Sequence, residues 1–163
     1  MLLCTNIRLF IYNKHKMKKV NLVKNILDSF EKLTGKIIIT RMNPEADLLE
    51  IENADFALVA HGTEEDPILN FGNQFALKLW EMKWDDFVKT TSKTTAETDL
   101  RENRSEILKI VSKQGYYDNY QGVRISSKGN RFKIKNAVIW NVNDENGNLI
   151  GQAAYFKTVQ FIK

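Results

Sequence analysis

The stretch GVRISSKGNRFKIKNAVIWNVNDENGNLIGQAAYFKTVQFI, residues 122–162, decides the fold class of this chain. It holds three runs rich in β-branched and aromatic residues, which favour strands. Two polar turns separate the runs, and Lys128-Gly129 and Asn146-Gly147 mark them, because glycine and asparagine tolerate the positive φ angles of tight hairpins. The stretch therefore predicts three consecutive antiparallel strands.

The alternation of side chains along these strands predicts which of them form the core. If Lys128-Gly129 is a two-residue loop, Ile125 lies opposite Phe132. Ala137 and Ile139 then lie on the opposite face of the sheet, where we expect an N-terminal helix to cover them. The predicted core face carries Phe132, Ile134, Val138, Trp140 and Val142.

Upstream of this meander, the sequence predicts two short strands, residues 54–62 and 68–71, joined by the polar turn TEEDP. Helical segments follow at residues 73–80, 84–88 and 100–114, where apolar residues recur at three- and four-residue steps. Two strands, a helical middle and three strands make a main domain over residues 54–163.

Residues 17–53 are predicted to precede this domain as a helix, a short strand and a linker. Apolar residues recur with helical spacing from Val20 to Leu33, and Gly35 follows as a stop signal. Residues 36–40 are β-branched and predict a short strand. Asn43-Pro44 is interpreted as a break before an acidic linker over residues 45–55.

The positive charge of the chain is concentrated at its beginning. The sequence has 24 basic and 20 acidic residues, a net charge of +4. Six cations precede the first acid, Asp28, and they are Arg8, Lys14, Lys16, Lys18, Lys19 and Lys24. The chain without these six carries 24 − 6 = 18 basic against 20 acidic residues, so we expect no nucleic-acid partner for the body.

The first residues also raise a question about the start of the chain. Met17 is followed by two lysines and is an alternative start, which would make residues 1–16 a disordered leader or an untranslated extension. The leader holds the one cysteine, Cys4, which excludes a disulfide within the chain. No apolar run approaches the length of a membrane helix, about 18 residues. We expect a cytoplasmic protein without a membrane partner.

Four blocks of the sequence resemble the MEKHLA family of PAS-like domains. They are HGTEEDPILNFGNQFALKLWEMKWDDF (residues 61–87), TSKTTAE (91–97), GYYDNYQGVRISSKGNRFKIKNAVIWNV (115–142) and GQAAYF (151–156). The resemblance covers roughly residues 20–162. It implies an α+β domain with a PAS-like five-stranded antiparallel sheet, helices on one face, and an added N-terminal amphipathic helix. It also implies a sensory or interaction module, of the stand-alone bacterial type.

PAS domains commonly hold a small molecule between the sheet and the helices, so polar or aromatic residues there are the candidate ligand-binding residues. Each has a structural alternative: the tryptophans as core, the arginines in ion pairs with Glu97 or Asp118, and the histidine, asparagine and serine as turn or cap residues. Small residues around position 152 either leave a cavity beside a tryptophan or accommodate its ring. The candidates are His61, Asn73, Trp80, Ser92, Arg124, Arg131, Trp140 and Gln152.

The residue types that given segments of the sequence lack limit the chemistry that we expect of this chain. The body has no cysteine for a flavin–cysteine adduct, and residues 100–114 have no histidine to ligate haem. His61 and the acids after it are too few ligand types for a metal site, and no catalytic residue is identified.

Three hypotheses remain open. The first is a sensory module that binds a small organic ligand or a protein partner without catalysis. The second is an enzyme that uses His61, Arg124, Arg131 and Gln152 around the cavity. The third is a pure dimerisation module that acts through the N-terminal helix.

Overall fold

The computed structural model describes residues 2–97 and 101–163, and the side chains of residues 7–97 and 105–163. It is built on one antiparallel sheet with the strand order β2-β1-β5-β4-β3, and β6 also pairs with β4. The α+β class is confirmed, and the predicted last strand is interrupted at Lys157, which gives six strands instead of five. The strands are β1 (Ala57–His61), β2 (Leu69–Gly72), β3 (Tyr116–Ile125), β4 (Arg131–Asn143), β5 (Leu149–Phe156) and β6 (Thr158–Ile162).

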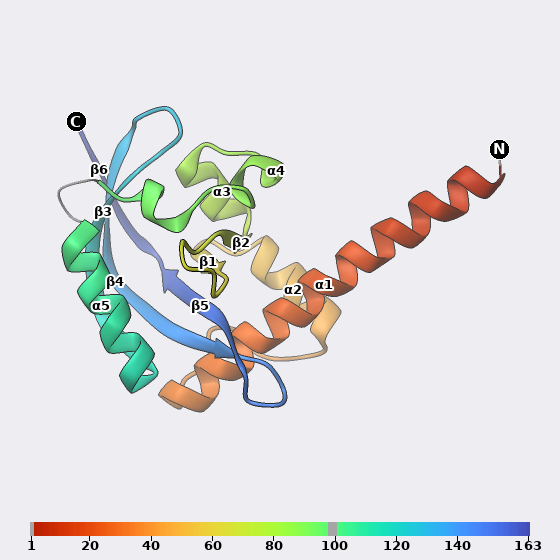
Figure 1. The fold of residues 1–163 in the computed structure, drawn as a ribbon, viewed down its shortest axis with the longest axis horizontal. Helices are drawn as coiled ribbons and strands as arrows, with labels where there is room; N and C mark the ends of the chain where they lie inside the picture. The colour runs from red at the N-terminus through yellow and green to blue at the C-terminus, as the bar shows by residue number, and fades with distance from the viewer. Residues whose placement is uncertain (1, 98–100) are drawn as a thin grey trace.

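Helices cover both faces of this sheet (Figure 1). Each face has its own cluster of buried apolar side chains. One face packs against α1 (Leu2–Thr34) and α2 (Pro44–Glu52). The other packs against the helical middle of the chain. This layer contains α3 (Gln74–Trp80), α4 (Trp84–Phe87), the 3₁₀ helix η1 (Ser92–Thr95) and α5 (Arg101–Gln114).

Two asparagines shift the pairing of β3 with β4. Asn119 and Asn136 have φ angles of 57° and 53°, in the left-handed region that asparagine tolerates better than most residues. The register of the strand pair shifts beside both of them, once between Tyr117 and Tyr120 and once between Tyr120 and Gly122. Each asparagine therefore acts as a β-bulge, in which one strand gains an unpaired residue.

The bulge at Asn136 reverses the alternation of β4, so the predicted core face was wrong. The prediction assumed a period of two along the whole strand, and an inserted residue breaks that period. Ala137 and Ile139 lie away from α1, which instead packs on Trp140 and Val142. The face toward α3 and α5 carries Phe132, Ile134, Ala137 and Ile139, and the face toward α1 carries Val138, Trp140 and Val142.

The β3–β4 hairpin differs from the expected two-residue loop by one residue. The backbone N–H of Ser126 donates to the carbonyl of Asn130 at 2.8 Å, which leaves three residues in the loop. Gly129 takes the positive φ that such a loop requires, 83°. Arg124 therefore pairs with Phe132, whereas the predicted register placed Ile125 there. Arg124 consequently lies on the same face as Phe132.

The N-terminal segment also differs from its prediction. Residues 2–34 form one continuous helix, so the residues expected as a leader belong to α1, and its first half projects from the body (Figure 1). The side chain of Cys4 lies outside the described residues. Residues 36–40 form no strand. No helix in the described part of the chain is long and apolar enough to cross a membrane. Translation from Met17 stays a prediction.

The acidic linker expected after Pro44 is the helix α2. Asn43 is its N-cap, because its side-chain oxygen accepts a hydrogen bond from the N–H of Ala46 at 3.0 Å. Proline at the first helical position loses no helical hydrogen bond. The pair Asn43-Pro44, interpreted as a break, is therefore a helix start.

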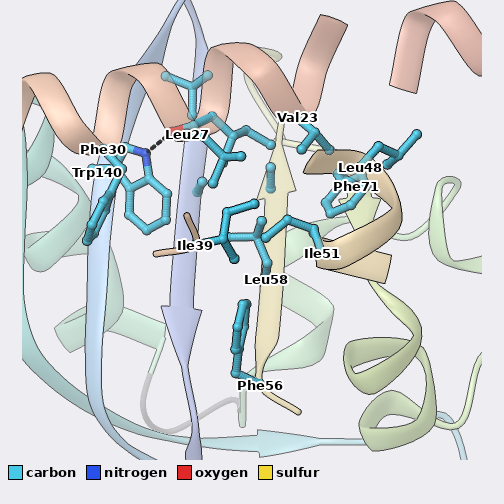
Figure 2. Packing of buried hydrophobic residues seen from close by; sticks show 14 of the residues in the cluster. Val23, Leu27, Phe30, Ile39, Leu48, Ile51, Phe56, Leu58, Phe71 and Trp140 are labelled. Carbon is cyan, nitrogen blue, oxygen red and sulfur yellow. Dashed lines mark hydrogen bonds between the residues drawn. The ribbon is translucent and has the colours of Figure 1, made fainter. Parts of the chain in front are cut away.

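Trp140 fastens α1 to the sheet. Its indole is fully buried, and its Nε1 donates to the carbonyl of Ile26 in α1 at 3.0 Å (Figure 2). Phe30 meets the same indole edge-on, with ring centroids 4.8 Å apart. Edge-to-face pairs and buried N–H donors with partners both favour this single position of the helix.

A polar network joins α1 to α2 beside this contact. Arg41 donates to Asp47 at 2.7 Å and to Asp28 of α1 at 2.8 Å. Burial raises the pKa of Asp28, but hydrogen bonds from Lys24 and Arg41 and the charges of both outweigh it and lower the pKa below the usual value. The ionised form of Asp28 is thus favoured in the folded chain.

Replacing Trp140 by phenylalanine should reduce the free energy of unfolding by about 1–3 kcal/mol. The change removes the N–H donor and leaves space under α1. Urea unfolding of the full chain measures the loss. Trp84→Phe is the matched control, because Trp84 is only partly buried and should lose less than about 1 kcal/mol. Equal losses in the two variants would contradict the role of Trp140.

Asp28→Asn should make the stability of the chain less sensitive to acid. Because the pKa of Asp28 is lower in the folded state, its stabilisation is complete above the unfolded pKa, about 4, and is lost as the pH falls through the folded pKa. Urea unfolding at several pH values between about pH 3 and pH 7 gives the slope of the free energy of unfolding against pH. Glu31→Gln, at an exposed carboxylate of the same helix, should keep the wild-type slope.

Candidate functional site

A cavity of about 50 Å³ lies between the sheet and the layer of α3, η1 and α5. Apolar side chains from β1, β2, β4, β5 and α4 form most of its wall. Five of the eight predicted residues line it: His61, Trp80, Ser92, Arg124 and Gln152. Two further polar residues, Thr95 and Tyr120, line it as well.

Arg124 and Tyr120 meet over a glycine on β3. Residues 120, 122 and 124 share one face of a strand, since side chains alternate. A Cβ on Gly122 would lie 2.9 Å from Arg124 Nη1 and in collision with the Tyr120 hydroxyl. The bare backbone at Gly122 therefore lets Arg124 Nη2 donate to the Tyr120 hydroxyl at 2.9 Å. The guanidinium carbon also lies 5.4 Å from the centroid of the tyrosine ring.

The guanidinium of Arg124 is buried, with 7% of the residue exposed. Its other hydrogen bond goes from Nη1 to the carbonyl of Val123 at 3.0 Å. No acidic side chain within ion-pair distance is found for it among the described residues. The alternative of a structural ion pair is therefore realised by Arg131 and not by Arg124.

Arg131 lies outside the cavity and is held by an acid. Its Nε and Nη2 donate to the two carboxylate oxygens of Glu97, the second at 3.0 Å. The hydrogen bond with Glu97 and its charge raise the pKa of Arg131. Arg131 alternates with Phe132 along β4, and it is exposed. The four residues of the enzyme hypothesis are consequently not brought together.

Gln152 and His61 lie side by side on paired strands, since their Cα atoms are register partners. Gln152 Nε2 donates to Asn141 Oδ1 at 3.1 Å, and it lies 3.4 Å from the hydroxyl of Ser112 on α5. His61 Nδ1 lies 2.8 Å from the carbonyl of Gly62, in agreement with its expected role in fixing the turn. Both side chains line the cavity at the end nearest α5.

Asn73 and Trp140 do not reach the cavity. Asn73 is fully buried, and its side-chain oxygen accepts from the N–H groups of Leu58 and Ala76. Its Nδ2 donates to the carbonyls of Ile51 and Phe56. It is thus the N-cap of α3 and a link between the layers, as the structural alternative stated. Trp140 lies on the other face of the sheet, under α1.

Trp80 forms the wall near the β3–β4 hairpin. Its ring meets those of Phe132 and Phe156 edge-on, at 5.2 and 6.2 Å between centroids. Its Nε1 is buried and has no acceptor among the described residues. An unsatisfied buried donor costs about 1–3 kcal/mol, so this wall offers a free N–H to an incoming acceptor.

Sequence reasoning missed Tyr120 and Thr95. Tyr120 could have been found, because Tyr-X-Gly-X-Arg on a strand places an aromatic ring and a cation on one face with room between them. Thr95 faces the cavity in a 3₁₀ helix, where its hydroxyl donates to the carbonyl of Ser92 at 2.7 Å. No pattern of the sequence marks that position.

The charge of the wall is simple. Among the lining residues whose side chains are described, Arg124 is the one with a full formal charge, and none is an aspartate or glutamate. Within the described side chains, no group of three histidine, cysteine, aspartate or glutamate residues could hold a metal ion. The arrangement can bind an uncharged or anionic group.

Solved structures with the same fold are PAS domains. The PAS domain of a protein from Colwellia psychrerythraea has a TM-score of 0.61 at 13% sequence identity, covering 72% of this chain and 95% of that one. An RNA-binding light-oxygen-voltage receptor has a TM-score of 0.60 at 15% identity, covering 72% of this chain and 33% of that one. A PAS domain of a two-component sensor histidine kinase has 0.53 at 12% identity, covering 70% and 91%. The PAS-like fold is confirmed.

Sequence comparison adds the family. No curated protein matches this chain. The family model of the MEKHLA domain matches residues 20–161. The match includes α2, the whole sheet except its last residue, and all residues around the cavity. Since it spans most of the chain, this chain belongs to the MEKHLA domain family.

Proposed function

We propose that this chain is a sensory module that binds a small organic molecule in the cavity between the sheet and α3, η1 and α5. The observation that carries the proposal is the set of polar side chains gathered in an otherwise apolar, mostly enclosed cavity. Such a combination is typical of small-molecule sites. A volume near 50 Å³ favours a ligand of few heavy atoms. A cytoplasmic location remains part of the proposal.

The proposed signal passes through the sheet to α1. Ile139 and Ala154 are paired and lie on the cavity side, whereas their neighbours Trp140 and Ala153 are paired and lie under α1. A ligand that moves β4 or β5 would therefore change the position of the Trp140 indole, and with it the position of α1. This replaces the expected contact of α1 with Ala137 and Ile139. Ligand binding would shift the population of α1 positions.

The enzyme alternative has less support. His61, Arg124 and Gln152 line the cavity, but Arg131 is occupied by Glu97 outside it. The remaining groups can orient a ligand through hydrogen bonds.

Filling the cavity tests the proposed function. Ala154→Val adds two methyl groups on the cavity side, so it should abolish the rise in melting temperature caused by any ligand found in a metabolite screen. Ala153→Val is the matched control: Ala153 also borders the cavity, but it packs with Trp140 in the cluster under α1, whereas Ala154 packs in the cluster on the cavity side. The control should lower stability by about 1–3 kcal/mol and keep the response to ligand. A response that survives in Ala154→Val but not in Ala153→Val would contradict the cavity as the site.

We also propose that α1 joins two copies of the chain. The first half of α1 projects from the body (Figure 1). It exposes large apolar side chains, and Ile7, Phe10 and Ile11 share one face of the helix, since they lie three and four residues apart. A helix without tertiary packing is marginally stable in water. A second copy would cover this face and stabilise the helix.

Light scattering after size exclusion tests the dimer. The full chain should have twice the mass of one copy, and Phe10→Lys should weaken the dimer by burying a charge in its interface. Leu49→Lys is the control, because Leu49 is equally exposed but lies on α2. A monomer at micromolar concentration for the wild-type chain would contradict the dimer.

A further inference from the structure

Arg124 differs from the other arginines whose partners are described in the body. Arg41 pairs with Asp28 and Asp47, and Arg131 pairs with Glu97. Arg124 is more buried than Arg131, yet it has no acid beside it among the described residues. A guanidinium stays charged in proteins, and burying a charge without a counter-charge is costly. Within the described part of the chain, the cavity wall therefore carries a cation that no acidic side chain neutralises.

The hydrogen bonds of this cation are also incomplete. A guanidinium has about five N–H donors. Arg124 uses Nη1 toward the carbonyl of Val123 and Nη2 toward the hydroxyl of Tyr120. The hydroxyl of Tyr120 accepts there, so its own hydrogen remains to be donated. With the Nε1 of Trp80, which has no acceptor in the described part of the chain, the wall carries three groups able to donate to one ligand.

We propose that the ligand is a small monocarboxylate, whose carboxylate binds Arg124 and whose short apolar chain lies against the apolar wall. This inference rests on the proposed function and names its ligand class. The described residues of the wall include one cation, Arg124, and no acid, which matches a ligand with a single negative charge. A carboxylate matches the planar fork of a guanidinium through two parallel hydrogen bonds.

The rest of the cavity sets the size and polarity of the chain. Leu69, Phe87, Ile134 and Phe156 surround the space beyond the guanidinium. The described lining residues include no second residue with a full positive charge, so a dicarboxylate would bury an anion without a formal counter-charge. The small volume admits an acid with a few carbon atoms. Gly122 is the feature that keeps this arrangement open, because any side chain there would meet Arg124 and Tyr120.

The first test compares charge at constant shape. The full chain is titrated by calorimetry at neutral pH with propionate, butyrate and isobutyrate, and with the corresponding amides. We expect binding of at least one carboxylate at concentrations where its amide does not bind. Inorganic phosphate is a further arm, and we expect no binding because a second charge has no partner.

The second test assigns the binding to Arg124. Arg124→Gln should weaken carboxylate binding by about a hundredfold or abolish it, since a charge-assisted bidentate pair is lost. Arg124→Lys keeps the charge without the fork and should bind about tenfold more weakly. Tyr120→Phe removes one hydroxyl, keeps the ring, and should weaken binding severalfold. Arg131→Gln is the control and should bind as the wild-type chain does, because Arg131 lies outside the cavity.

A third readout does not depend on the Arg124 and Tyr120 variants. The chain has three tryptophans, so ¹⁵N-labelled protein gives three indole N–H signals. Trp80→Phe and Trp140→Phe each remove one signal and so assign the signals of these two residues. The signal of Trp80 should move on addition of the carboxylate, and that of Trp140 should move much less.

The outcomes separate the two proposals. Equal binding of amides and carboxylates, binding of phosphate alone, or unchanged carboxylate binding in both Arg124 variants and Tyr120→Phe would overturn the ligand class and leave the cavity as a binding site. Absence of binding by every carboxylate would overturn the ligand class too. If a broad metabolite screen also shows no stabilisation that Ala154→Val removes, the proposed function fails with it.

Discussion

The left-handed backbone at Asn136 is the constraint on which the arrangement of the molecule depends. The sheet lies between two helical layers, so the apolar side chains of β4 face either α1 or the layer of α3 and α5. The bulge at Asn136 places Phe132, Ile134, Ala137 and Ile139 together on the cavity side. It also frees Trp140 to reach the carbonyl of Ile26 on the other side. Without it, one half of β4 would present its apolar residues to the wrong layer.

Much of the fold follows from local sequence, and the errors follow from single inserted residues. Within residues 54–163 the order of strands and helices was predicted apart from the interruption at Lys157, and so were the positions of the two glycine turns and the N-terminal helix, whereas α2 was missed. The register was not, because a three-residue hairpin and two bulges each shift the pairing by one residue while leaving the pattern of residue types almost unchanged. Asn119 and Asn136 were the signals available, as asparagine tolerates left-handed backbone. Asn43-Pro44 was ambiguous, since the same two residues are typical of the break after a strand and of the start of a helix.

The site shows the same limit at the level of side chains. Five of the eight residues that were predicted from their type line the cavity. The other three contact residues distant in sequence that hold them elsewhere. Asn73 is held by backbone groups of α2, β1 and their connection, Trp140 by α1, and Arg131 by Glu97. The sequence offered Glu97 as a partner for either arginine. The one-residue shift of the hairpin placed Arg124 on the inward face with Phe132, whereas Arg131, the neighbour of Phe132 in β4, faces outward in either register.

If a ligand binds as proposed, the same shift would link its recognition to the position of α1. Arg124 and Phe132 are register partners beside the hairpin, and β4 continues from Phe132 to Trp140, whose side chain lies on the opposite face of the sheet under α1. A carboxylate drawn to Arg124 would act on β3, and the ladder of β3 with β4 is continuous in spite of its bulges. Because backbone ladders and close-packed interiors transmit displacement, movement at Arg124 would reach the indole that contacts α1. The bulge at Asn136 lies on that route, so in the proposed function the residue that separates the two faces of β4 would also lie between the ligand and α1.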